Sequence, residues 1–257
     1  MIPGLERLEY AHKPLVRIMG HKPPEAMGEA DARGYVARRG REGVAVATIR
    51  TELQALKAAL RWAAGNNLIN GAPAIVMPPR PEGRVRWLTR AEAERLIAAC
   101  HAPHIKLFII IALNTGARSG AILSLTWDRV DFASRTVDFR VPGVAQTKKR
   151  KTLASMNETL YAALAQAKDA ATSESVIEWA GGSIEKVKHG FRDTATRAGL
   201  KGVTPHTLRH TAVSWLLQKG VSVWDVAGFV GMTVDMVQTV YGHHSEDGMR
   251  RVARALG

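Results

Sequence analysis

The strongest constraint on the fold is a proline-rich interruption at residues 77–84, where Pro78, Pro79 and Pro81 fall within four positions. Proline lacks a backbone N–H and cannot continue a helix, so no helix crosses this stretch. The arginines up to Arg86 favour solvent or a phosphate backbone over a core. We therefore expect a small N-terminal domain at residues 1–80, a linker at 81–86 and a larger domain at 87–257.

The N-terminal part reads as helical. Residues 30–39 predict a short helix, and Thr48 is a plausible cap for a longer one whose apolar positions recur at helical spacing. Those positions are Ile49, Leu53, Leu56, Leu60 and Ala63. Residues 1–29 show no clear pattern, and we predict no helix through the glycine and proline cluster at 20–24.

The larger part predicts a mixture of helices and short strands. Thr89 and Glu92 form a capping-box pattern that starts a helix at about residues 90–100. The apolar run at 105–114 stops at Thr115 and Gly116, which favours a buried helix. Residues 135–141 alternate as a strand, 146–153 read as a basic turn entering another strand, and everything from Leu160 onward reads as helices. The predicted fold class is mainly α with a small β-sheet (α+β).

The composition points to a polyanionic partner. The formal net charge is +13 at pH 7 and the pI is about 10.3, so nucleic acid is the first candidate, ahead of a membrane surface or an acidic protein. The single cysteine, Cys100, excludes a disulfide framework within one chain. The longest apolar run, at 107–113, is too short to span a bilayer, and the start of the chain has no signal-peptide pattern. We expect a cytoplasmic, nucleoid-associated protein without a membrane partner.

The segment from Thr204 to Arg209 is the most specific candidate site. Thr204 suits an N-cap and Pro205 the first helical position, which places His206 and Arg209 on one face of the first turn. Free backbone N–H groups and the positive end of the helix dipole favour a phosphate there. An ordinary capped helix with a surface arginine is the alternative. His210 is expected to face elsewhere, as a packed structural histidine.

Two further basic elements are candidates. Arg118 follows the turn at 114–117 beyond the apolar helix, where its fork can bind two phosphate oxygens or form a structural salt bridge. Residues 148–151 are four cations in a row, by default a solvated turn. On a hairpin, one lysine could instead reach a leaving oxygen as a general acid.

Tyr241 lies downstream of all these elements and is a candidate nucleophile for a phosphodiester. A lone tyrosine is more often a packing residue. His243 and His244 follow Tyr241. Because no carboxylate lies at ligand spacing from them, two adjacent histidines give little support for a metal site. We expect no metal and no cofactor.

With these residues in order, the chain resembles the tyrosine recombinase (phage integrase) family. The resemblance rests on Thr-Gly-Ala-Arg at 115–118 ahead of residues 125–131, a Thr-Lys hairpin, His-x-x-Arg at 206–209, the Gly231 turn, and Tyr241 ahead of His243. It covers nearly the whole chain, with 30–80 similar to a core-binding domain and 87–257 to a catalytic domain. It implies site-specific recombination of double-stranded DNA, for a phage or an integrative mobile element.

The resemblance also implies roles for individual residues. Arg118 and Arg209 would clamp the scissile phosphate, Lys148 would protonate the leaving 5′ oxygen, and His206 would assist proton transfer. Tyr241 would attack to give a 3′-phosphotyrosine bond. Two positions depart from the family pattern: Met232 stands where the family has histidine or tryptophan, and Ala121 where an acidic residue is frequent. His243 or His244 could supply the donor that Met232 lacks.

The resemblance further implies a homotetramer on DNA, formed from a monomer or weak oligomer, with accessory DNA-bending or directionality proteins as possible partners. Two alternatives stay open. One is a catalytically weakened or silent DNA-binding relative, suggested by Met232 and Ala121. The other is a relaxing enzyme of the type IB topoisomerase kind, which uses the same chemistry without partner exchange.

Overall fold

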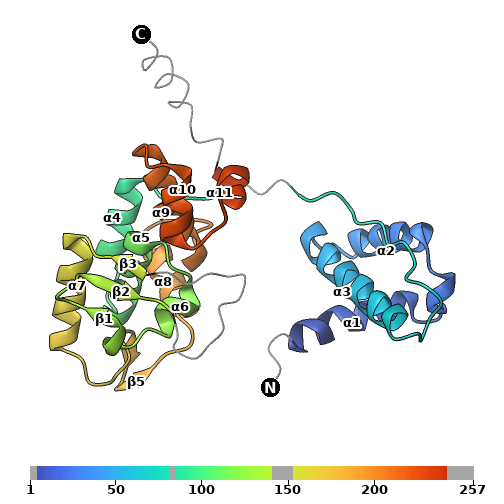
Figure 1. Cartoon of the computed structure of the whole chain (residues 1–257), viewed down its shortest axis with the longest axis horizontal. Coiled ribbons are helices and arrows are strands. Elements are labelled where there is room, and N and C mark those ends of the chain that lie inside the picture. The colour runs from blue at the N-terminus through green and yellow to red at the C-terminus, as the bar shows by residue number, and fades with distance from the viewer. Residues whose placement is uncertain (1–4, 82–84, 141–152, 242–257) are drawn as a thin grey trace, which may run out of the picture. The chain divides into compact units, whose positions relative to one another are not determined.

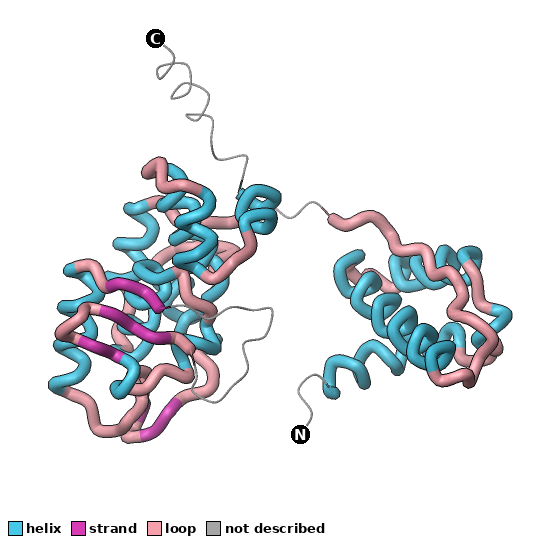
Figure 2. Tube along the Cα trace, in the orientation of Figure 1, coloured by secondary structure: helices cyan, strands magenta, loops and turns pink. Residues whose placement is uncertain are grey.

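The structure is a computed structural model of the 257-residue chain that describes residues 5–81, 85–140 and 153–241. The chain forms two compact units, Met1–Gly83 and Arg84–Gly257. Helices dominate both units, and the strands lie in the larger one (Figure 2), so the predicted class of mainly α with a small β-sheet is confirmed. No helix in the described ranges is long and apolar enough to cross a membrane.

The described residues of the smaller unit form α1 (Leu5–Met19), α2 (Glu29–Arg41) and α3 (Val46–Gly65), with a 3₁₀ turn at Pro24–Ala26. The helix predicted at 30–39 is confirmed as α2. The prediction that Thr48 caps the next helix is wrong. The backbone carbonyl of Ala45 accepts hydrogen bonds from the amides of Thr48 and Ile49 at 2.9 and 3.1 Å, so α3 begins three residues earlier than predicted and Thr48 lies inside its first turn.

A buried carboxylate joins α2 to α3. Glu52 is 4% exposed and accepts hydrogen bonds from the Tyr35 hydroxyl at 2.8 Å and from Arg39 Nη2 at 2.6 Å. Because a buried charge is tolerated only when it is paired and hydrogen-bonded, the network fixes how these two helices pack. The apolar core around it comprises Leu15, Met19, Ala32, Ile49, Leu53, Leu60 and Ile75.

The larger unit is built on helices with two small antiparallel sheets (Figure 1). Its helices are α4 (Arg90–Ala98), α5 (Pro103–Thr115), α6 (Ser119–Leu123), α7 (Glu158–Asp169), α8 (Lys188–Arg197), α9 (Pro205–Gln218), α10 (Val223–Val230) and α11 (Val234–Tyr241), with a 3₁₀ turn at Trp127–Arg129. Strands β1 (Val130–Asp131), β2 (Thr136–Asp138) and β3 (Leu153–Ser155) pair in that order, with Val137 opposite both Val130 and Ala154.

A second sheet corrects the expectation that only helices follow Leu160. Strands β4 (Glu178–Trp179) and β5 (Gly182–Ser183) form a hairpin. The two residues between them, Ala180 and Gly181, have φ angles of 50° and 76°. Two consecutive positive φ angles are what a two-residue hairpin turn requires, and this turn signal was missed in the sequence.

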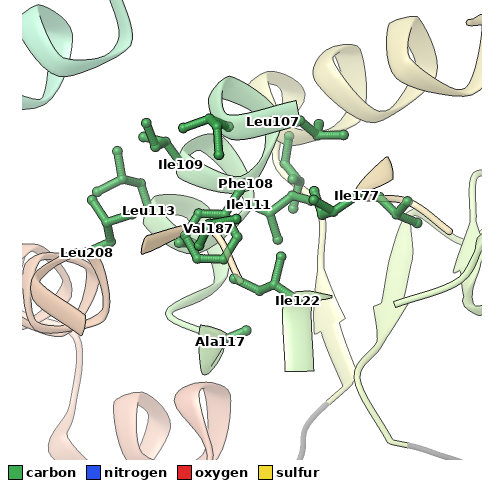
Figure 3. Close-up of a cluster of buried hydrophobic side chains, with 14 of the residues drawn as sticks. Leu107, Phe108, Ile109, Ile111, Leu113, Ala117, Ile122, Ile177, Val187 and Leu208 are labelled. Carbon is green, nitrogen blue, oxygen red and sulfur yellow. The ribbon is translucent and has the colours of Figure 1, made fainter. Parts of the chain in front are cut away.

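Helix α5 forms the centre of the core of the larger unit. Its buried side chains include Ile105, Leu107, Phe108, Ile109, Ile111 and Leu113. Figure 3 shows the five from Leu107 to Leu113 beside Leu208 of α9, Ile177 and Val187. An apolar surface around the whole helix demands partners on several sides. Consequently the C-terminal end of α5 is held rigidly next to the start of α9.

The capping box predicted at Thr89 and Glu92 is confirmed. The Glu92 amide donates to Thr89 Oγ1 at 3.2 Å, and the Thr89 amide donates to Glu92 Oε2 at 2.9 Å. The adjoining Leu88 is tied to α9, because its amide donates to Thr211 Oγ1 and its carbonyl accepts from Trp215 Nε1, both at 2.9 Å. The start of the larger unit is therefore fixed on α9.

Candidate active site

Two glycine turns shape the candidate site. Helix α5 ends at Gly116 and α10 ends at Gly231, with φ angles of 61° and 64°. Both are left-handed caps, which glycine adopts without strain. A Cβ on Gly116 would lie 2.8 Å from Val230 Cγ1, so this turn also needs glycine for close packing.

Each turn holds an arginine that comes from elsewhere in the chain. Arg209, on the first turns of α9, donates from Nη1 to the Gly116 carbonyl at 2.5 Å. Arg118, the N-cap of α6, donates from Nη2 to the Gly231 carbonyl at 3.0 Å. These two bonds orient both guanidinium groups on backbone carbonyls.

Arg209 carries the clearest sign of an anion site. It is 3% exposed, and its buried Nη2 has no hydrogen-bond partner among the described residues. Burial, followed by the positive charge of Arg118, lowers the pKa of Arg209 from 12.5 to about 10, and Tyr241 opposes this shift. Because a buried, unpaired cationic donor is unfavourable, the site is suited to an incoming anion.

His206 is the exposed member of the group. The predicted helix start is confirmed, with Thr204 as N-cap, Pro205 in the first turn and Thr207 Oγ1 accepting from the Thr204 amide at 3.0 Å. Partial burial of its ring, and then the charges of Arg209 and Arg118, lower the pKa of His206. It borders a surface pocket whose lining includes Lys186, Lys188 and Arg192.

Tyr241 ends α11 and lies inside the same unit's site. Its side chain is 1% exposed, and its hydroxyl is 2.5 Å from Nδ1 of His210. The expectation that His210 faces elsewhere is wrong. His210 follows His206 by one helical turn, and the two rings meet edge to face with centroids 4.4 Å apart. The spacing of four residues was the signal that could have placed both histidines on one side of α9.

The protonation states of this pair follow from burial. Burial raises the pKa of Tyr241 to about 12, with Arg209 opposing the shift. Burial lowers the pKa of His210 to about 4, and the charges of His206 and Arg209 act in the same direction. At neutral pH both groups are therefore uncharged. The Tyr241 hydroxyl can then donate its hydrogen bond to Nδ1 of His210 in the tautomer that carries the ring proton on Nε2.

The two departures from the family pattern lie beside these groups. Met232 follows the Gly231 turn and packs, partly buried, on an apolar cluster that includes Val230 and Tyr241. Its thioether offers no hydrogen for a phosphate oxygen. Ala121 is buried in α6 at 7% exposure.

The larger unit thus brings together four of the residues predicted from the sequence, namely Arg118, His206, Arg209 and Tyr241. Lys148, His243 and His244 lie outside the described residues. Within the described ranges, no group of three or more His, Cys, Asp or Glu side chains could hold a metal ion.

A buried tyrosine hydroxyl that contacts His210, close to a buried arginine with an unpaired nitrogen, is suited to chemistry on an anion. The model of the phage integrase family matches residues 86–247, which is most of the larger unit. The chain belongs to this family.

Known relatives agree with this assignment. The integrase of Salmonella phage P22 is 30% identical over 230 residues, which cover 82% of this chain and 58% of that integrase. The chain thus matches less than two thirds of the P22 protein. The Tn1549 transposon integrase in complex with transposon right-end DNA superposes with a TM-score of 0.78 at 20% identity, covering 96% of this chain and 94% of the other. A lambda integrase tetramer bound to a Holliday junction gives 0.72 at 19% identity, covering 92% and 72%. At these identities the two structures show a shared fold.

Proposed function

We propose that the chain is a tyrosine-type site-specific DNA recombinase that serves a phage or an integrative mobile element. The observation that carries this proposal is the buried, unpaired Nη2 of Arg209 in the site that also holds the Tyr241 side chain. A buried guanidinium group with an unpaired donor, close to a tyrosine hydroxyl, is the arrangement that attack on a phosphodiester requires.

In the proposed reaction, the Tyr241 oxygen attacks the scissile phosphorus and the product is a 3′-phosphotyrosyl bond with a free 5′-hydroxyl. Arg118 and Arg209 hold two phosphate oxygens and neutralise the charge that grows as the phosphorane-like state forms. Lys148 protonates the leaving 5′ oxygen, and His206 assists proton transfer at the nucleophile. Because Tyr241 lies in its own chain's site, cleavage occurs in cis.

Met232 is compatible with this chemistry on structural grounds. The Gly231 carbonyl just before Met232 orients Arg118, and the Met232 side chain packs on the apolar cluster to which Tyr241 belongs. Met232 cannot donate a hydrogen bond to the phosphate, so another residue must donate to that phosphate oxygen. We assign this role to His243 or His244. Normal cleavage by both His243→Ala and His244→Ala would rule out this assignment.

For the assembly, residues 1–80 act as a core-binding domain, 81–86 as a linker and 87–257 as the catalytic domain on double-stranded DNA. The net charge of +13 supports contacts to phosphates, and such binding weakens with salt. Strand exchange between two duplexes needs four active sites, as in the lambda integrase tetramer on a Holliday junction. A monomer or weak oligomer assembles on DNA, and Tyr241 must become exposed there because its side chain is 1% exposed in the free chain.

The test is covalent capture on nicked suicide duplexes, which lose the short strand after cleavage and trap the adduct. Since the target site is not set by the structure, a pool with a randomised core serves as the probe, and trapped DNA is amplified and recaptured. Wild type and Tyr161→Phe, a matched tyrosine that packs on Phe132 in the larger unit, should enrich an adduct that survives denaturation. Tyr241→Phe should give none, and an adduct in that variant would overturn the proposal.

The second candidate, a silent DNA-binding relative, is favoured by Met232 and Ala121. It predicts enrichment by non-covalent binding without any adduct. A relaxing enzyme predicts adducts and relaxed plasmid, but no joined product from two duplexes that carry the recovered site.

A further inference from the structure

The hydroxyl of Tyr241 is hydrogen-bonded to His210, although the proposed mechanism gives proton transfer at the nucleophile to His206. The oxygen lies 2.5 Å from His210 Nδ1. The His206 ring instead packs edge to face on the His210 ring. The two histidines of α9 therefore have different positions relative to the nucleophile.

We propose that His210 is the general base of the cleavage step and takes the phenolic proton of Tyr241 at Nδ1. His206 then serves as a positioning residue whose ring fixes that of His210. The inference rests on the proposed function and names a further catalytic residue for it. It uses the contact to the reacting oxygen, which is the geometric requirement for a base.

The bond between the Tyr241 oxygen and phosphorus forms while the bond from phosphorus to the 5′ oxygen breaks. The phenolic proton moves to His210 Nδ1, which leaves an imidazolium because Nε2 keeps its proton. The leaving 5′ oxygen takes a proton from Lys148. Rejoining reverses each transfer, and the imidazolium then returns its proton to the tyrosine oxygen.

The surroundings of His210 make this transfer depend on DNA. The described ionisable groups that bear on its ring are His206, Arg209 and Tyr241, with Arg118 behind them. In the free chain the positive charges oppose an imidazolium. A phosphate between the two arginines offsets them and favours the charged ring. Proton transfer from Tyr241 to His210 therefore accompanies attack on a bound phosphate, and the tyrosine stays neutral without one.

The hydrogen bond itself is tested without DNA. In the free protein labelled at histidine, the nitrogen NMR spectrum should show His210 as a neutral ring with Nδ1 as acceptor and Nε2 protonated. Tyr241→Phe should shift the His210 Nδ1 signal and leave that of His101, at the far end of α5, unchanged. An Nδ1 signal unaffected by Tyr241→Phe would overturn the proposal.

The base role is tested by adduct formation on the duplex recovered from the pool. One version of this duplex carries sulfur in place of the bridging 5′ oxygen at the scissile phosphate. The thiolate leaves without help from a general acid. A variant that stays slow on this duplex is therefore defective in activating the nucleophile and not in protonating the leaving group. His210→Ala should slow adduct formation about 100-fold on both versions. His210→Asn keeps an acceptor near Nδ1 but cannot take a proton, and it should stay at least about 10-fold slow. His101→Asn, at an exposed histidine, is the matched control.

The outcomes separate the two proposals. If His210→Asn reacts at the wild-type rate, or if His210→Ala does, the base role is overturned while the proposed function stands. If wild type forms no adduct, the proposed function falls and the base role with it. If His210→Ala does not fold, His210→Asn alone gives the decision, because its amide fills the same place and accepts the same hydrogen bond.

Discussion

Replacing Arg209 with methionine should stabilise the free protein while it abolishes DNA cleavage. Arg209 is 3% exposed, and one of its terminal nitrogens lacks a partner among the described residues. Methionine is shorter than arginine, but its flexible, unbranched side chain can fill much of the space without a charge. A residue kept for function at a cost in stability is expected to behave in this way.

The magnitude follows from two opposing contributions. Lowering the pKa of Arg209 from 12.5 to about 10 corresponds to a penalty of about 3 kcal/mol for the charged group in the folded state at neutral pH. Against this, the variant loses the bond from Nη1 to the Gly116 carbonyl, worth about 1.5–3 kcal/mol for a charged donor. The net expectation is a gain of about 1 kcal/mol, or a rise in Tm of about 3 °C for a unit of this size.

The assay is urea unfolding followed by tryptophan fluorescence. Trp62 is in the smaller unit and the other five tryptophans are in the larger one, so the signal reports the unit that contains Arg209. Arg197→Met is the matched control. Arg197 also donates to a backbone carbonyl, that of Ala99 at 3.0 Å, but it is exposed, and its loss should change stability by less than about 0.5 kcal/mol.

A second arm uses sulfate as a stand-in for the scissile phosphate. Sulfate stabilises folded proteins generally, so the decisive quantity is the difference between wild type and variant. Wild type should gain more stability from sulfate than Arg209→Met does. If the variant were destabilised by more than about 1 kcal/mol, or gained as much from sulfate, Arg209 would be a structural arginine and the anion-site reasoning would be wrong.

Three further predictions concern stability. Gly116→Ala should destabilise the larger unit by about 2 kcal/mol in urea, because φ is 61° and the new Cβ would lie 2.8 Å from Val230 Cγ1; an unchanged midpoint would contradict this. Tyr35→Phe should lower the stability of the smaller unit by about 1–2 kcal/mol, because buried Glu52 loses the hydroxyl donor. Thermal melts followed by circular dichroism measure this change, and an unchanged stability would show that the hydrogen bond from Tyr35 to Glu52 does not stabilise the unit. Wild type should lose stability as the pH falls from about 6.5 towards about 4, because His210 binds a proton in the unfolded chain over this range but stays neutral in the folded protein. The His210→Asn variant should lose less stability. Identical urea unfolding profiles for the two proteins from pH 7 to about 4.5 would refute the effect of burial on the pKa of His210.

The parts of the fold that were predictable from the sequence are those fixed by neighbouring residues. The capping box at Thr89 and Glu92, the start of α9 at Pro205 and the glycine end of α5 all depend on contacts within a few positions. Such signals act locally, so a sequence pattern identifies them. The hairpin at Ala180 and Gly181 was equally local, and it was missed because its strands are two residues long.

The contacts that build the candidate site were not predictable in this way. The bond between His210 and Tyr241 joins positions 31 residues apart, and that between Arg209 and the Gly116 carbonyl spans 93. The first depends on how α9 and α11 pack and the second on how α9 packs on the end of α5, and no local pattern predicts either. The resemblance to the family supplied the polar residues of the site, but it left His210 out and could not show that Arg209 lacks a partner.

The central claim is that Tyr241 attacks a DNA phosphate, and mass spectrometry of the trapped adduct tests it most directly. After nuclease and protease digestion of the wild-type adduct, the account predicts a nucleotide linked through a 3′-phosphate to the peptide that contains Tyr241. The released strand should carry a 5′-hydroxyl. A nucleotide attached to another residue, a 5′-phosphate link, or DNA binding with no adduct at all would contradict the account.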